Sequence, residues 1–331
     1  MAIAKEMESQ GHKVTCLEDK TFGIDYLLSY HNKVKRWAKY LLGKSTKKKN
    51  EYWQSCFRDN MELKVPFDIL LCINGYSLCK EFFRLLKVSS PKVRTIYYLW
   101  DSCSLYAFNK NFCYFDKCTT FDWVDAKKYR IDYLPMFWIP SNIENSVDTS
   151  VFFVGTIHSD RFHVLRKIIA QLDCYKIPYY IKLFVPEKKG LLFKFMYFLD
   201  CIKGDQSLTK DISEIMKNSS QYNFVIHEHI SLSEFNEKLA LSTHVIDIEQ
   251  PCQKALTPRT IQALSQNKKI ISTNTWLKNT EFYNEKQILI IDRKNPIISK
   301  SFIEEPFRSN AVSEEILKLR IDKWIRVLLL E

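Results

Sequence analysis

The 331 residues, 46% hydrophobic and 26% charged, have the composition of a globular protein, which excludes a disordered chain, and their number favours two domains. The net charge of +11 favours an anionic partner such as a nucleotide, a nucleic acid or an acidic membrane surface. The 10 cysteines form no CxxC pair or zinc-type cluster, and no run of about 18 apolar residues occurs, so we expect no metal site, no disulfide framework, no membrane span and a cytoplasmic location.

The first 140 residues alternate between helix and strand patterns. A helix over 1–10 and a strand over 13–17 open the chain. In doubly wound folds this order completes the first βαβ unit, so we expect the first strand of this domain to be missing. Helices are predicted over 24–42 and 51–63, with lysines 44 and 47–49 in a polar loop between them, over 78–86 and over 124–129. Strands are predicted over 67–72, 94–100 and 117–121.

Polar side chains follow the strands of this first half. Asn74, Asp101 and Asp122 stand where predicted strands end. In open α/β sheets this is the edge where ligands bind, and Asp101 is our candidate for a catalytic carboxylate. The alternative is that Asp101 and Asp122 only cap the turns that follow.

The second half begins after a crossing segment over 132–140 and a polar linker over 141–149. A strand over 150–154 runs into Gly155 and Thr156, and Arg161 stands at the start of the next helix. A glycine at this turn allows a ligand to approach the backbone. Strands over 179–185 and 223–226 follow, and the second leads into His227, a candidate ligand contact. His227 and His229 lack a third ligand, so zinc is not expected.

The segment over 188–203 alternates bulky apolar residues with lysines. It reads either as an amphipathic helix resting on a membrane, together with lysines 47–49, or as a helix packed on the protein itself.

The residues from 242 to 275 predict a strand, a loop, a helix and a strand. The strand spans 244–248, and the loop ends at Leu256. Thr257 suits the N-cap of the helix and Pro258 its first turn. The helix N-terminus then favours an anion such as a diphosphate, with Arg259 and Gln262 on one side of the first turn. Asn267 ends the helix before a strand over 269–272. A strand over 287–292 and one long amphipathic helix over 313–330 complete the chain.

Two motifs carry a resemblance to a known family. Phe153-Val154-Gly155 opens the second half, and Leu256-Thr257-Pro258-Arg259-x-x-Gln262-Ala263-Leu264 precedes the strand over 269–272. With two doubly wound halves, this pattern resembles the GT-B glycosyltransferases, in particular bacterial capsule and lipopolysaccharide transferases and the CgeB-like group. Gln262 stands where such families often have a glutamate, and Asn267 replaces a frequent glycine.

The resemblance implies an α/β fold of two Rossmann-like domains facing across a cleft. We expect an acceptor-side domain over 1–140, a linker over 141–149, a donor-binding domain over 150–312 and a C-terminal amphipathic helix over 313–331. The expected donor contacts are Gly155, Thr156, Arg161, His227, Leu256, Thr257, Arg259 and Gln262, with no metal and no cofactor.

The expected activity is transfer of a sugar from a nucleotide-diphosphate donor to a saccharide or lipid-linked saccharide acceptor in surface polysaccharide biosynthesis. Arg259, Arg161 and the N–H groups behind Thr257 would stabilise the leaving diphosphate, with Asp101 as the base. No DxD motif ends a strand, which favours a metal-independent enzyme. The expected location is the cytoplasm, either free or peripherally attached to the inner face of the membrane through the lysine-rich segments.

Two other classes of function are weighed against this one. The first is a nonenzymatic nucleotide-binding or polysaccharide-assembly scaffold of the same fold. The second is an NAD-dependent enzyme, which the lack of a GxGxxG motif disfavours. A nucleic acid is conceivable as a partner from charge alone, but it is not the partner we expect.

Overall fold

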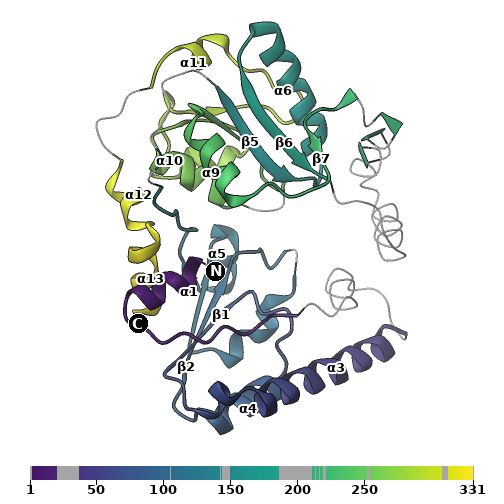
Figure 1. Ribbon diagram of the computed structural model, residues 1–331, viewed down its shortest axis with the longest axis vertical. Coiled ribbons are helices and arrows are strands. Elements are labelled where there is room, and N and C mark those ends of the chain that lie inside the picture. Colours follow the sequence, from purple (N-terminus) through teal and green to yellow (C-terminus); the bar gives the residue numbers. More distant parts are fainter. Residues whose placement is uncertain are drawn as a thin grey trace. The chain divides into compact units, whose positions relative to one another are not determined.

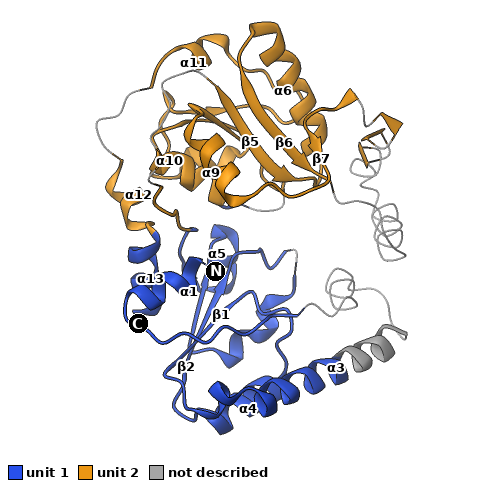
Figure 2. Ribbon diagram, viewed as in Figure 1, with its two compact units in different colours: residues 1–136, 252–255, 321–331 blue, residues 137–251, 256–320 orange. Residues whose placement is uncertain are grey.

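The computed structural model of the chain describes residues 2–20, 37–104, 106–141, 143, 150–185, 211–212, 214–215, 217–218, 221–251, 254–307 and 312–330. The chain divides into two compact units (Figure 2). Unit 1 comprises Met1–Met136, Cys252–Ala255 and Ile321–Glu331, and unit 2 comprises Phe137–Pro251 and Leu256–Arg320.

Unit 1 contains a parallel sheet in the order β1-β2-β3-β4. Its neighbouring strands β1 and β2 are labelled in Figure 1. The strands are β1 (Ile69–Ile73), β2 (Arg94–Leu99), β3 (Lys117–Thr120) and β4 (Asp132–Tyr133). The helices of this unit are α1 (Ala2–Ser9), α3 (Trp37–Asp59), η1 (Met61–Lys64), α4 (Lys80–Ser89), η2 (Phe108–Tyr114), α5 (Trp123–Tyr129) and α13 (Ile321–Leu329). Parallel strands require such helical crossovers, which cover both faces of the sheet.

Aromatic rings fill the core of unit 1. Tyr97, on the buried strand β2, stacks on Phe115 with ring centroids 4.3 Å apart. Phe83 of α4 stacks on Tyr114 at 4.4 Å. Such pairs bury large apolar surfaces, and their geometry fixes α4 and η2 against the sheet.

Two predictions for unit 1 are wrong. Residues 13–17 form no strand and pair with no strand of the described sheet. Side chain to main chain bonds fix the chain just after them, where the Asp19 carboxylate accepts hydrogen bonds from the N–H groups of Tyr76 and Ser77, each at 2.7 Å. Lysines 44 and 47–49 lie within the continuous helix α3 and not in a loop. Lysine is a good helix former, and an ion pair of 3.8 Å between Lys47 and Glu51 spans one turn. The helix predicted over 24–42 lies partly outside the described residues.

Unit 2 contains a parallel sheet in the order β10-β9-β8-β5-β6-β7. The strands are β5 (Val151–Thr156), β6 (Tyr179–Phe184), β7 (Val225–Ile226), β8 (His244–Asp247), β9 (Lys269–Ser272) and β10 (Ile288–Ile290). The helices are α6 (Arg161–Tyr175), α9 (Leu232–Ala240), α10 (Pro258–Ser265), η4 (Thr275–Asn279), α11 (Lys300–Glu304) and α12 (Glu314–Lys318). The strand order reverses between β5 and β8, which makes their carboxyl ends the expected ligand position.

Two adjacent lysines at the start of β9 fix helices to this sheet. Lys268 Nζ donates to Ala240 O at 3.1 Å, at the end of α9. Lys269 Nζ donates to the carbonyls of Phe302 and Glu305, at the end of α11. A cation at a helix C-terminus satisfies unpaired carbonyls and the helix dipole, which accounts for two buried ammonium groups.

The last helix of the sequence prediction is two helices. The helix is interrupted between α12 and α13, and α13 belongs to unit 1. Trp138 donates from its backbone N to Leu319 O at 3.0 Å and from Nε1 to Ile316 O at 2.6 Å, so it satisfies the carbonyls that a continuous helix would use. No helix in the described part of the chain is long and apolar enough to cross a membrane.

Candidate functional site

Asp247, the last residue of β8, organises the start of α10. Its carboxylate, which has no exposed surface, accepts hydrogen bonds from Thr257 Oγ1 at 2.8 Å and Thr260 Oγ1 at 2.9 Å. Thr257 is the N-cap of α10 and Pro258 opens its first turn, as the sequence predicts. The helix therefore begins at the carboxyl edge of the sheet.

Arg259, on the first turn of α10, lies against the ends of β5 and β8. Nη1 pairs with Asp247 Oδ1 at 2.8 Å, and Nη2 donates to Val154 O at 2.9 Å. The guanidinium lies 4.7 Å from the centre of the Phe153 ring. Burial lowers the pKa of Arg259, and the charge of Asp247 opposes that shift. Arg259 is thus a buried, paired cation with a fixed position.

Two more arginines lie close to the same strand ends. Arg161, at the start of α6, donates from Nη1 to Thr156 O at 2.6 Å and from Nε to Ile248 O at 3.2 Å. Arg293 pairs with Asp160 Oδ1 at 2.5 Å and with Glu249 Oε1 at 2.6 Å. We call Arg161, Arg259 and Arg293 the arginine cluster.

The charges of the arginine cluster act on the imidazole of His158. Burial, together with the charges of Arg161, Arg259 and Arg293, lowers the pKa of its imidazole to about 3. The imidazole is therefore neutral at physiological pH. Burial disfavours a charge of either sign here, whereas the positive charges of the three arginines disfavour a cation and favour an anion.

Gly155 is required by the packing of the cluster. A Cβ atom at this position would lie 2.9 Å from Arg259 Nη2, 3.0 Å from Phe153 Cζ and 3.1 Å from Arg161 Nη1. The missing side chain thus leaves room for two guanidinium groups beside the strand. The predicted role of this glycine is to let a ligand approach the backbone; in the structure its missing side chain makes room for Arg259 and Arg161, and Gly155 also lines a pocket.

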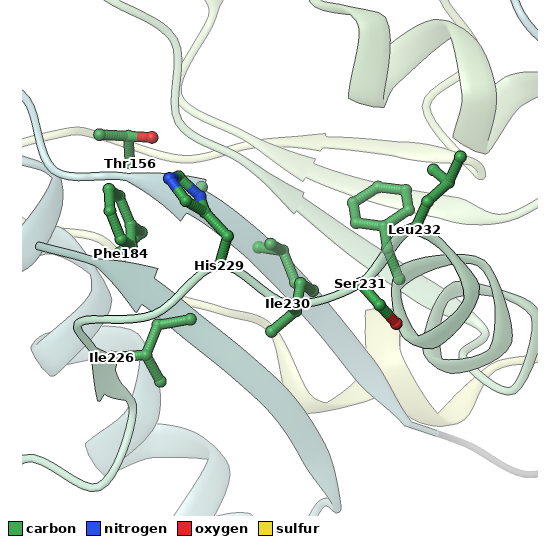
Figure 3. A pocket seen from close by; sticks show the side chains of 10 residues that line it. Thr156, Phe184, Ile226, His229, Ile230, Ser231 and Leu232 are labelled. Carbon is green, nitrogen blue, oxygen red and sulfur yellow. The ribbon is translucent and has the colours of Figure 1, made fainter.

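A pocket of about 300 Å³ opens on the other side of the same strand end (Figure 3). Its walls come from the ends of β5, β6 and β7 and the first turn of α9, and consist of Val154, Gly155, Thr156, Phe184, Ile226, His229, Ile230, Ser231, Leu232 and Phe235. The His229 ring stacks on Phe184, with centroids 3.9 Å apart and planes 25° from parallel. The pocket is mostly apolar and presents a flat ring pair, which suits a planar aromatic ligand group.

The structure brings together some of the predicted contacts and separates others. Gly155, Thr156, Arg161, Thr257 and Arg259 meet at the ends of β5 and β8. The remaining three predicted contacts, His227, Leu256 and Gln262, have other surroundings.

His227 Nδ1 lies 2.8 Å from Val185 O and therefore carries the proton, and this residue is not among those lining the pocket. The Leu256 side chain is buried. The Gln262 amide makes two bonds to the main chain of Ile139, at 3.0 and 3.1 Å, and so holds the crossing segment.

Arg293 and His158 were not among the predicted contacts, and of the two histidines weighed after β7 the prediction chose His227 over His229. Arg293 follows β10 closely, and the rule that strand ends carry ligand contacts selects it. His158 lies in the same loop as Gly155. No signal separates His229 from His227, since only the direction of the chain after β7 decides which ring faces the pocket.

The predicted catalytic residue, Asp101, belongs to unit 1, after the end of β2. Its Oδ2 accepts hydrogen bonds from Tyr76 Oη at 2.7 Å and Asn74 Nδ2 at 2.8 Å. Burial raises the pKa of Asp101, and these two bonds oppose the shift. Asp122 is the N-cap of α5, accepting from Val124 N at 2.8 Å, which fits the capping alternative for this residue.

Solved structures resemble the chain along most of its length. The OtsA apo structure matches with a TM-score of 0.57 and 10% identity, covering 94% of this chain and 83% of that one. An α,α-trehalose-phosphate synthase (UDP-forming) from Burkholderia xenovorans in complex with glucose-6-phosphate matches with a TM-score of 0.57 and 9% identity, covering 93% and 82%. The Candida albicans trehalose-6-phosphate phosphatase N-terminal domain matches with a TM-score of 0.54 and 13% identity, covering 98% and 87%.

No protein-family model matches the sequence, and no curated protein matches it. At these identities the structural likeness establishes the fold. The chain has the α/β fold of the GT-B glycosyltransferases, with Rossmann-like parallel sheets, as the sequence resemblance implies.

Proposed function

We propose that the chain is a glycosyltransferase. Unit 2 binds a nucleotide-diphosphate sugar, unit 1 binds a saccharide or lipid-linked saccharide acceptor, and the reaction belongs to surface polysaccharide biosynthesis. The fold supports this proposal, since the solved structures that resemble the chain include UDP-forming synthases. Fold alone does not assign an activity, so the proposal depends on the residues at the end of β5.

One observation carries the proposal: the residues at the end of β5 contact two arginines of the cluster and also line the pocket. Val154 O accepts from Arg259 and Thr156 O accepts from Arg161, while Val154, Gly155 and Thr156 form one wall of the pocket. An aromatic group in the pocket would therefore lie against the same strand end that two guanidinium groups, those of Arg259 and Arg161, contact. A nucleoside diphosphate has this combination of a flat base and an anionic group.

The arginine cluster suits the chemistry of the leaving group. Cleavage of the bond to the sugar places negative charge on the diphosphate, and fixed cations stabilise that charge without reorganising. Asp247, Asp160 and Glu249 hold Arg259 and Arg293 in place through ion pairs of 2.5 to 2.8 Å. The N–H groups at the start of α10 add a second source of positive potential.

The pocket suits the base of the nucleotide. Its volume of about 300 Å³ lies at the lower end for ligand pockets, in the range of a nucleoside. The Phe184 and His229 rings offer a stacking surface, and Ser231, at the start of α9, also lines the pocket (Figure 3). Gln262 was predicted to contact the donor. We propose instead that it only holds the main chain of Ile139 in place.

Asp101 of unit 1 remains our candidate for the base that takes the proton of the acceptor hydroxyl. A metal ion is not part of this proposal, since arginines and the helix N-terminus supply the positive charge.

A turnover assay tests the proposal. The full chain is incubated with a panel of nucleotide sugars and a mixture of saccharide and lipid-linked acceptors, and release of the nucleoside diphosphate is followed together with sugar transfer. We expect coupled release and transfer with one donor, reduced at least about a hundredfold in Asp101→Asn. Tight donor binding without any release would instead support the nonenzymatic scaffold.

A further inference from the structure

A second pocket, of about 240 Å³, lies within unit 1, where strands β3 and β4 meet the last turns of α13. Lys117 and Thr119 line it from β3, Asp132 from β4 and Leu328 from α13. Thr119 and Asp132 are partners in the parallel ladder, so their side chains stand next to each other on one face of the sheet. All lining residues belong to unit 1, and the pocket is therefore separate from the one proposed for the nucleotide base in unit 2.

The hydroxyl of Thr119 has no hydrogen-bond partner in the described part of the chain, although the side chain is only 2% exposed. Two other buried threonines of the sheet use their hydroxyls: Thr120 Oγ1 accepts from Asp122 N at 3.2 Å, and Thr95 Oγ1 donates to Asp116 Oδ2 at 2.8 Å. A buried hydroxyl without a partner is unfavourable for the folded chain. A ligand in the pocket would supply the missing partner.

The two charged side chains of the pocket differ in how far they are engaged. The Lys117 ammonium donates over 2.8 to 3.3 Å to three carbonyls at the end of α13, those of Val327, Leu328 and Leu330. Asp132 is exposed, and its carboxylate has no hydrogen bond or ion pair within the described residues. Because the opposite charges of Lys117 and Asp132 compensate each other, the pocket favours a neutral ligand that donates hydrogen bonds to the carboxylate.

The remaining surface of the pocket is largely apolar. Leu134 and Leu328 are buried, whereas Val327 is 51% exposed although it lines the pocket. A sugar ring has C–H groups on its faces and hydroxyl groups at its rim, and so matches an apolar surface beside a carboxylate and a hydroxyl. The volume lies below the roughly 300–1,000 Å³ of pockets for drug-sized ligands, which restricts the ligand to about one sugar ring.

We propose that this pocket binds one neutral monosaccharide unit. Its hydroxyl groups donate to the Asp132 carboxylate and bond with the Thr119 hydroxyl, while one face of the ring lies against Leu134 and Val327. The site requires no transfer reaction and goes beyond the proposed function, because all of its binding groups lie on β3, β4, the residue after β4 and α13.

Methyl NMR of the full chain tests the proposal, because the methyl signals of Leu134, Val327 and Leu328 report on this pocket directly. The probes are D-glucose, D-galactose, D-mannose and N-acetyl-D-glucosamine, with putrescine as a cationic probe. We expect at least one of the sugars to shift these signals saturably, and putrescine to leave them unchanged. In Asp132→Asn, which alters an exposed side chain and leaves the fold intact, the affinity for that sugar should fall about tenfold.

Thr119→Val is the second variant, with Thr120→Val as its matched control on the opposite face of the same strand. Replacing an unpartnered hydroxyl by a methyl group should leave Tm equal or higher without sugar, while the affinity for the sugar falls about fivefold or more. Thr120→Val removes the acceptor of Asp122 N, so it should lower Tm and leave the affinity unchanged.

Three outcomes would overturn the proposal. The first is that none of the sugars shifts the methyl signals of the wild-type pocket. The second is that putrescine shifts them and the sugars do not, which would assign the pocket to a cation. The third is that Thr119→Val lowers Tm as much as Thr120→Val, because the Thr119 hydroxyl would then already have a partner in the folded chain.

Discussion

Gly155 and Arg259 lie so close together that a methyl group on Gly155 would stand 2.9 Å from Arg259 Nη2. Strand β5 can therefore carry only a glycine beside the arginine cluster without displacing it. The same residue lines the 300 Å³ pocket. A change at Gly155 is therefore expected to alter both the arginine cluster and the pocket.

Gly155→Ala should displace Arg259 and Arg161 from their carbonyl partners, Val154 and Thr156. We expect a loss of about 1–3 kcal/mol in the free energy of unfolding, as for other overpacked sites, and a donor affinity lower by at least about tenfold. The measurements are urea unfolding and calorimetric titration of the donor. Ala126→Val, which overpacks a buried position of α5 in unit 1, is the control. Equal effects of both variants on donor affinity would contradict a local role for Gly155.

Arg259→Ala should cost far more stability than the loss of a surface residue. It leaves the unexposed Asp247 carboxylate with two hydroxyl partners and no cation. Breaking a buried ion pair in this way typically costs about 3–5 kcal/mol. Urea unfolding should show this loss, and Asp247→Asn combined with Arg259→Met should lose less than the two single variants added together. An Arg259→Ala chain as stable as wild type would instead mean that the pair does not form.

Lys268 should make stability depend on pH in the alkaline range. Burial lowers the pKa of its ammonium to about 8, against about 10.4 in an unfolded chain. Between these values the unfolded chain binds a proton that the folded chain does not, so the free energy of unfolding should rise with pH. Urea midpoints of wild type and Lys268→Met, measured from pH 7 to pH 10, should therefore diverge in favour of wild type. A difference that stays flat or falls would contradict the burial of this lysine.

Membrane contact stays a prediction, and the candidate contact surface is reduced to the exposed lysines of α3. Lys47 and Lys48 are exposed on α3, whereas Lys49 donates to Tyr76 O, and residues 188–203 lie outside the described part of the chain. Each exposed lysine near an anionic surface contributes about 1 kcal/mol. Sedimentation with anionic vesicles should weaken about tenfold or more in the double variant Lys47→Glu, Lys48→Glu. Binding that is the same for neutral vesicles, or for the double variant, would exclude α3 as the contact.

Local patterns made part of this fold predictable. The start of α10 is set by neighbouring residues, the N-cap Thr257 and the proline after it, and the helix begins as predicted. A cap of the same local kind opens α9, where Ser231 Oγ accepts from Glu234 N at 3.1 Å, as the Ser231-x-x-Glu234 spacing indicates. The strand over 269–272 was predicted with the bounds that the structure has, and the strands over 94–99 and 179–184 with one residue too many at the end, because their apolar runs are bounded by polar residues.

Contacts between distant residues were not predictable. Gln262 bonds to Ile139, which is 123 residues away, and no local signal indicates that the amide has such a partner. The ion pairs of Arg293 join β10 to Asp160 and Glu249, so the third member of the cluster emerges only from the strand order. The division of the last helix depends likewise on Trp138, which supplies partners for the carbonyls at its break.

The central claim is that unit 2 recognises a nucleoside diphosphate through the pocket and the arginine cluster together. The most direct test is calorimetric titration of the wild-type chain with UDP, GDP and ADP, each beside its own nucleoside. We predict that one diphosphate binds at least about 30-fold more tightly than its nucleoside, since a charge-assisted contact contributes about 2 kcal/mol, and that this advantage is lost in Gly155→Ala. A folded wild-type chain that binds no nucleoside diphosphate, or binds diphosphate and nucleoside equally, would contradict the account.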